Sequence, residues 1–230
     1  NEFLKLNPIV MKRNEDLQRD VQDAIRWEPL LSAAEIGVTA KDGVITLTGI
    51  VDSYAKKLEA EDAAKKVAGV RAIAQEIEIR FANSNKKNDA EVATEIVTAL
   101  TSNFEIPENL VQVKVENGFV TLEGELSWNY QKEAAKRVVN HLVGVKGVTN
   151  NIRIKSEFAD QIEKVEIEKA LFRNRTVDSE DIHVEVSVNK VTLNGTVTSF
   201  YERGEAERMA WNAPGVSKVD NELLIDYAGF

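Results

Sequence analysis

The strongest constraint on the fold of this chain is a phrase that occurs three times. DGVITLTGIV at residues 42–51 returns as NGFVTLEGEL at residues 117–126 and as NKVTLNGTV at residues 189–197. The glycines of the phrase lie 75 and then 71 residues apart, and a second set of glycines keeps the same spacing. The two sets are Gly49, Gly124 and Gly195, and Gly69, Gly144 and Gly215. Two markers in fixed register predict three tandem copies of one unit of roughly 70 residues.

Each copy starts with a helical pattern and continues with a β-hairpin. In the first copy Leu17, Val21 and Ile25 recur at intervals of four residues, which is typical of one buried helix face. Residues 36–40 then alternate between apolar and polar types, as in a strand with one buried face. A tight KDG or ENG turn follows in the first two copies, where glycine suits a hairpin loop. The third copy reads VNK at this place, and we expect Asn189 to form the turn.

The repeated phrase is the second strand of the hairpin, and a helix and a last strand complete each copy. The first glycine permits a close backbone approach, and the second ends the helix. Last strands are expected at residues 70–79, 145–154 and 216–225. The helical crossover allows each of them to pair in parallel with a hairpin strand. Each unit is therefore predicted to be α-β-β-α-β, an α+β two-layer sandwich in which two helices cover a three-stranded mixed sheet.

The three units are expected at residues 12–82, 88–156 and 158–228. Residues 1–11 are interpreted as a leader that comes from an expression vector, with the natural start at Met11. The alternative is a mature chain from which a signal peptide has been removed. The first interpretation predicts a cytoplasmic protein, and the second predicts a periplasmic one.

Composition excludes several classes of function. The chain has no cysteine, which excludes disulfides, thiolate catalysis and cysteine-based metal sites. Its net charge of −9 and the absence of a run of Lys and Arg argue against nucleic acid as a partner. The same charge opposes a general attraction to anionic lipid, although a local lipid site stays open. No apolar run approaches the ~20 residues that a transmembrane helix needs.

Candidate catalytic chemistry is sparse in this sequence. The two histidines, His141 and His183, do not show the spacing of a metal motif and are expected at the surface. Pairs of acidic residues such as Glu59 and Glu61 are typical of a solvated helix face. We therefore expect no enzymatic activity, no metal and no cofactor.

Aromatic residues gather where the second helix of each unit begins. They are Tyr54 in the first unit, Trp128 and Tyr130 in the second, and Phe200 and Tyr201 in the third. Two interpretations stay open for these side chains: packing over a sheet edge or between units, and contact with a partner or a lipid surface. Three other aromatics, Trp27, Phe104 and Trp211, lie late in helices and are expected to pack.

The predicted element order and the repeated phrase, followed by AGV at residues 68–70, resemble the BON domain, the bacterial OsmY and nodulation module. The resemblance covers residues 12–228. It implies a non-enzymatic module that binds phospholipid or other membrane components, often under osmotic or envelope stress. Residues 11–49 are similar to the start of multi-copy members that are described as osmotically inducible or transport-associated proteins.

The expected function is therefore a stress-related binding protein of the BON type that contacts phospholipid or envelope-associated partners. The alternative is a soluble module that senses a ligand or cation, or that acts on proteins like a chaperone, without membrane contact.

Overall fold

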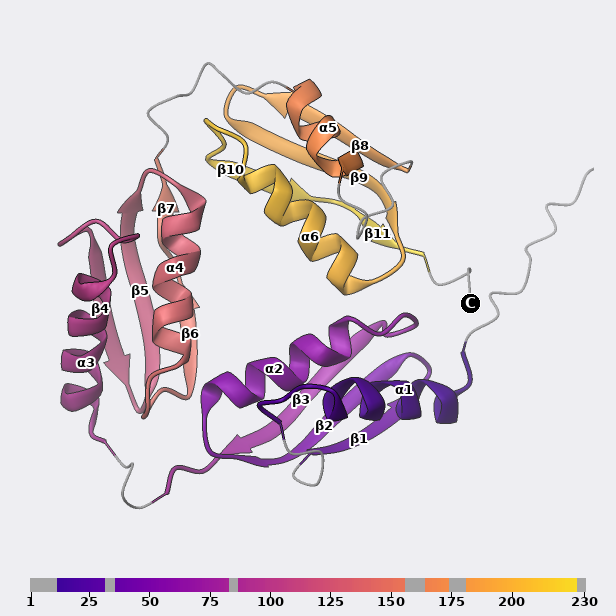
Figure 1. The fold of residues 1–230 in the computed structure, drawn as a ribbon, viewed down its shortest axis with the longest axis horizontal. Helices are drawn as coiled ribbons and strands as arrows, with labels where there is room; N and C mark the ends of the chain where they lie inside the picture. Colours follow the sequence, from indigo (N-terminus) through magenta and orange to yellow (C-terminus); the bar gives the residue numbers. More distant parts are fainter. Residues whose placement is uncertain (1–11, 32–35, 83–86, 156–163, 174–180, 227–230) are drawn as a thin grey trace, which may run out of the picture.

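The computed structural model describes residues 12–31, 36–82, 87–155, 164–173 and 181–226, and it contains three units of the same order (Figure 1). The first unit consists of α1 (Asn14–Arg26), β1 (Ile36–Lys41), β2 (Val44–Val51), α2 (Tyr54–Lys65) and β3 (Ala72–Ile79). The second consists of α3 (Asp89–Ser102), β4 (Val111–Glu116), β5 (Phe119–Leu126), α4 (Asn129–Asn140), β6 (Gly147–Asn150) and β7 (Arg153–Ile154). The third consists of α5 (Lys164–Arg173), β8 (Ile182–Ser187), β9 (Lys190–Val197), α6 (Phe200–Trp211), β10 (Lys218–Asn221) and β11 (Leu224–Ile225).

The strand carrying the repeated phrase is the centre of each sheet. β2 pairs antiparallel with β1 and parallel with β3, as the crossover predicted. In the second and third units the last strand is interrupted, so that β6 and β7 both pair parallel with β5, and β10 and β11 with β9. The α+β sandwich with a mixed sheet is thus confirmed, with this interruption as the difference from the expected single last strand.

Each unit has its own apolar core between its helices and its sheet. In the first unit the core joins one face of α1, the inward positions of β2 and a row of alanines on α2. Ile45 and Leu47 of the repeated phrase are completely buried there. The small alanines allow α2 to lie close to the sheet. Three separate cores explain why the pattern of buried residues repeats with the spacing of the glycines.

The glycine of the repeated phrase lies where two strands approach closely. Gly124 has a φ of 143°, and a Cβ atom built on it would lie 2.1 Å from the carbonyl oxygen of Leu110. At Gly195 the same atom would lie 1.8 Å from the carbonyl oxygen of Asp181. Any side chain at these positions would push the first strand of the hairpin away, so that the phrase must contain glycine here.

The third hairpin turn differs from the expectation. Asp42 and Asn117 have left-handed backbones, with φ of 51° and 54°, and each precedes a glycine. In the third unit Val188 takes this conformation, with φ of 56°, whereas Asn189 occupies the position of the glycine. The prediction that Asn189 would supply the special backbone was therefore wrong. A β-branched residue is poorly suited to positive φ, so this turn is strained.

A side-chain amide fixes the last strand of every unit to the second helix. The amide nitrogen of Asn150 donates to the carbonyl oxygen of Lys132 at 2.9 Å, and its oxygen accepts from the backbone N–H of Ile152 at 3.3 Å. Gln75 and Asn221 make the same two bonds in the other units. Gln75 has a longer side chain and leaves β3 continuous, whereas both asparagines lie at the interruption of the strand. This amide clamp was not predicted from the sequence.

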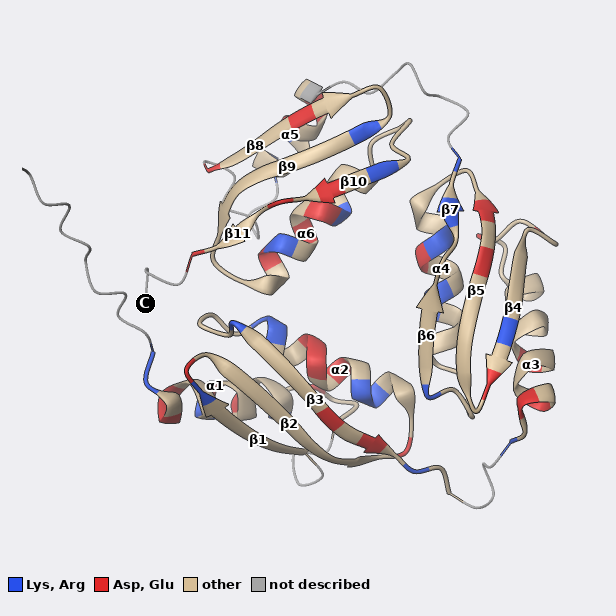
Figure 2. Ribbon diagram, turned by 180° about the vertical axis from the view of Figure 1, so that it is seen from behind, with Lys and Arg blue, Asp and Glu red and all other residues tan. Residues whose placement is uncertain are grey.

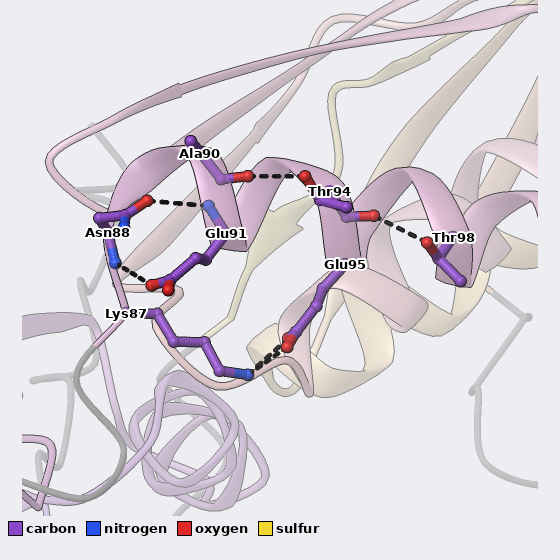
Figure 3. A network of polar contacts seen from close by, with 7 residues as sticks. All are labelled: Lys87, Asn88, Ala90, Glu91, Thr94, Glu95 and Thr98. Atoms are coloured by element: carbon purple, nitrogen blue, oxygen red, sulfur yellow. Dashed lines mark hydrogen bonds and ion pairs between the residues drawn. The ribbon is translucent and has the colours of Figure 1, made fainter.

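The start of α3 shows how a helix in this chain is capped (Figure 3). Asn88 accepts a hydrogen bond from the backbone N–H of Glu91 at 3.0 Å, and the Glu91 carboxylate accepts from the backbone N–H of Asn88 at 2.9 Å. Lys87 pairs with Glu95 at 2.6 Å over the next turn. This reciprocal cap satisfies two backbone donors that the helix itself leaves unpaired.

The three units follow one another around a ring, with α2, α4 and α6 on its inner side (Figure 1). α2 contacts α6, so the last unit lies against the first. Two aromatic side chains join neighbouring units: Tyr54 packs against the core of the second unit, and Phe200 packs against the core of the first. The same position of the repeated unit therefore serves twice as a joint between units.

Candidate functional site

The aromatic residues at the starts of α2, α4 and α6 were the candidates for contact with a partner or lipid. The structure places these side chains in different surroundings. Tyr54 is half-buried, and its hydroxyl forms a hydrogen bond with the backbone of Val148 in the second unit. Burial raises the pKa of the Tyr54 hydroxyl, and this hydrogen bond opposes the rise. Tyr54 and Phe200 thus pack between units.

The second unit has Asn129 at the position of Tyr54 and Phe200, and its aromatics lie on either side. The rings of Trp128 and Tyr130 are 6.5 Å apart between centroids and tilted by 32°. The Tyr130 side chain is 53% exposed. α4 therefore begins with an aromatic pair at the surface. In the third unit Tyr201 is 39% exposed and lies beside the groove between α2 and α6.

That groove has a volume of about 650 Å³ and a lining of mixed charge. On the first unit, Lys66 pairs with Glu28 at 2.8 Å, and its hydrogen bond lowers the pKa of the Glu28 carboxyl. Burial raises the pKa of the neighbouring Glu59, and Glu28 beside it contributes to the rise. Four acidic and three basic side chains line the groove, so that neither sign of charge dominates strongly.

The second unit contains a basic segment that was not predicted from the sequence. Residues 128–155 contain six Lys and Arg residues and one acidic residue, a net charge of +5 in a chain of net charge −9. The equivalent segments carry +1 at residues 53–80 and −3 at residues 199–226. A count of charges by unit, rather than over the whole chain, would have found it. Figure 2 shows these basic residues on α4, on β7 and at the start of β6.

Few of these cations are neutralised by neighbours. Within the described residues, the ion pairs of the basic segment are those of Arg137 with Glu105 at 2.6 Å and of Lys155 with Glu125 at 4.0 Å. Lys132, Lys136, Lys146 and Arg153 have no carboxylate within ion-pair distance in that part of the chain. In the first unit, by contrast, Lys56, Lys65, Lys66 and Arg80 are all paired.

Two of the aromatics that were expected to pack do not. Trp27 is 85% exposed and Phe104 is 98% exposed, because both follow the last core-facing turn of their helices. Trp211 does pack against the core of the third unit. Phe172 at the end of α5 is also 80% exposed. Each first helix therefore has an exposed aromatic at its end.

Other features bear on candidate chemistry. His141 is exposed and lies 2.8 Å from the carbonyl oxygen of Arg137, and His183 is exposed on β8. No cluster of His, Cys, Asp and Glu that could hold a metal ion occurs among the residues with described coordinates. In the same part of the chain, no helix is long and apolar enough to span a bilayer.

Comparison with known proteins agrees with the repeat. The model of the BON domain family matches residues 13–80, 88–156 and 159–227. Osmotically-inducible protein Y of Escherichia coli strain K12 is 29% identical over 129 residues, which cover 54% of this chain and 64% of that protein. An uncharacterized protein in the gshII 5′ region of Anaplasma centrale is 42% identical over 62 residues, 27% of this chain and 40% of that protein. The matches thus span less than two thirds of either relative.

Solved structures give more distant matches. A structural protein of the type III secretion system of Chlamydia trachomatis aligns over 92% of this chain and 93% of its own, with 18% identity and a TM-score of 0.25. The C-terminal domain of the same protein aligns over 94% of this chain and all of its own, with 17% identity and a TM-score of 0.26.

Proposed function

This chain belongs to the BON domain family, and from that premise we propose that it is a non-enzymatic, stress-related binding protein that contacts phospholipid or envelope-associated partners. The family model matches all three units, and the relative from Escherichia coli is named for osmotic induction. The compartment, cytoplasm or periplasm, stays a prediction that cell fractionation tests.

The main support for the proposal comes from the start of the second helix in each unit, where the aromatic side chains have different surroundings in the second unit than in the other two. Tyr54 and Phe200 begin their helices and pack against neighbouring units. In the second unit the aromatic pair of Trp128 and Tyr130 stands at this place instead, with Tyr130 more than half exposed. Tyr and Trp combine an apolar ring with a polar group, which suits contact with a membrane interface or a protein partner. We therefore assign the contact to the start of α4.

Flotation with vesicles made from a bacterial lipid extract tests this function. The wild-type chain is expected to rise with the vesicles. The double variant Trp128→Ala and Tyr130→Ala is expected to keep its circular dichroism spectrum and to bind less. Phe104→Ala, which removes an almost fully exposed aromatic of the same unit, is the matched control and is expected to bind normally.

Two results would contradict the proposal. Failure of the wild-type chain to float, together with a thermal shift caused by a small ligand or cation, would favour the soluble sensing module. Unfolding of the double variant would instead show that the aromatic pair belongs to the core.

A further inference from the structure

The third joint of the ring lacks the aromatic side chain that fills the other two. Tyr54 of the first unit packs against the second, and Phe200 of the third unit packs against the first. The second unit has Asn129 at this position. A groove of about 1020 Å³ lies between the last strand of the second unit and the third unit, where α6 ends and β10 begins. We propose that this groove binds an extended peptide with acidic side chains, which pairs as an additional strand with the edge formed by β6 and β7.

The last strand of the second unit has an open backbone edge. Among the described strands, β6 and β7 pair only with β5, and β7 faces β10 of the third unit (Figure 1). Five consecutive residues of this strand, 150–154, line the groove. Unpaired backbone N–H and C=O groups on a sheet edge are a template for another strand, and peptides bind many proteins in this way. A groove that follows a strand edge therefore favours an extended chain over a compact ligand.

The equivalent edges of the other two units are covered by a basic side chain from the second helix. Lys57 donates a hydrogen bond to the carbonyl oxygen of Ile77 on β3 at 2.8 Å. Arg203 donates one to the carbonyl oxygen of Asn221 on β10 at 2.9 Å. Lys132 is the equivalent residue of the second unit, and its side chain makes no hydrogen bond or ion pair within the described part of the chain. The second unit therefore leaves its edge uncovered.

The side chains on this edge suit an acidic peptide. Asn151 and Arg153 are exposed, and the first unit has Glu76 and Glu78 at their positions. The third unit also has a glutamate at the position of Asn151. Arg153, like Lys132, has no carboxylate within ion-pair distance among the residues with described coordinates. Because like charges on neighbouring strands repel, an acidic peptide would avoid the edge of the first unit and be attracted to that of the second.

The rest of the lining is compatible with this ligand. Trp211 at the end of α6 lines the opposite wall and offers an indole ring to an apolar side chain of the peptide. Lys218 on β10, which is engaged in an ion pair, lines the same wall. The acids of the lining, Glu123 and Glu125, lie on β5, whereas Arg153 lies on the edge strand itself.

The fluorescence of Trp211 provides a test. In the variant Trp27→Phe with Trp128→Phe, Trp211 is the only tryptophan, so that its emission reports on the groove. The probe is a short peptide in which glutamate alternates with valine, and it is expected to change this emission as it binds. The same peptide with N-methyl groups on its backbone nitrogens cannot donate hydrogen bonds to a strand and is expected not to bind.

A substitution on the edge strand tests the position of the peptide. Arg153→Glu in the same tryptophan variant should weaken binding of the glutamate peptide about tenfold, because an exposed attraction becomes a repulsion. The matched control is Lys114→Glu, which makes the same change of charge at an exposed residue of β4, the opposite edge of the sheet. The control is expected to bind like its parent. An equal loss in both would show that binding follows total charge, and would overturn the inference.

Other outcomes also decide the matter. Equal binding of the N-methylated peptide would overturn strand pairing. A change of emission with chitotriose, but with neither peptide, would assign the groove to a saccharide instead. A wild-type chain that floats with vesicles but does not bind the peptide would contradict this inference alone. Binding of the peptide without flotation would support it and contradict the lipid contact of the proposed function. Circular dichroism of each variant verifies that it is folded.

Discussion

The strained hairpin turn of the third unit provides a sharp test of the structural reasoning. Val188 has a φ of 56° and is 73% exposed, so its side chain loses little packing when it is replaced. A left-handed backbone costs an ordinary L-residue roughly 1–2 kcal/mol, whereas Asn tolerates it through local hydrogen bonds. Val188→Asn should therefore stabilise the third unit by about 1 kcal/mol. For a domain of this size, the midpoint of thermal unfolding should rise by about 4–8 °C.

The measurement must observe the third unit alone, because a chain with three cores need not unfold in one step. Each unit contains one tryptophan, so Trp27→Phe with Trp128→Phe leaves Trp211 as the only reporter, and Trp211 packs against the third core. The reciprocal change Asn117→Val puts a valine in the equivalent turn of the second unit, and should destabilise that unit by a similar amount. An unchanged or lower midpoint for Val188→Asn would refute the argument from backbone strain.

Three further changes test the amide clamp, the glycine of the repeated phrase and the partly buried carboxyl of Glu59. Asn150→Ala removes both bonds of the amide clamp and should lower the stability of the second unit by about 2 kcal/mol in urea unfolding; Asn150→Gln should lose less, since Gln makes both bonds in the first unit. Gly124→Ala forces a Cβ atom against the carbonyl oxygen of Leu110 and should cost more than about 4 kcal/mol, seen as loss of the native spectrum. Glu59 has a raised pKa, so its charged form opposes folding above that pKa. Glu59→Gln should raise the thermal midpoint at neutral pH, and this gain should decline as the pH falls below the raised pKa and vanish below the ordinary pKa of a glutamate carboxyl. A gain that is independent of pH would exclude the titration of Glu59 as its cause.

Much of the fold could be predicted because the signal is repeated. The alternation of Ile36, Val38 and Ala40, and the equivalent runs in the other units, identified the first strands of the hairpins. Parallel pairing of the last strand followed from the helix that precedes it. Physical constraints that act within a few residues, such as period and turn chemistry, leave a clear trace in sequence.

The features that were not predicted arise from contacts between residues far apart in the sequence, or appear only when the three units are compared. The clamp joins Asn150 to a carbonyl of α4, a contact that no local pattern encodes. Val188 adopts positive φ because pairing of β8 with β9 fixes the turn length, which overrides its own preference. The exposure of Trp27 depends on where α1 ends relative to the core. The basic segment was hidden by an acidic total.

The joints made by Tyr54 and Phe200 also restrict how such a chain evolves. A copy of the unit that has an aromatic residue at the start of its second helix already carries the side chain that packs against another unit. The second unit has Asn129 at this position, so its helix start does not make such a joint and its surface is free to differ from those of the other two units. One residue at the helix start therefore separates a unit that holds its neighbour from a unit whose helix start is open to other contacts.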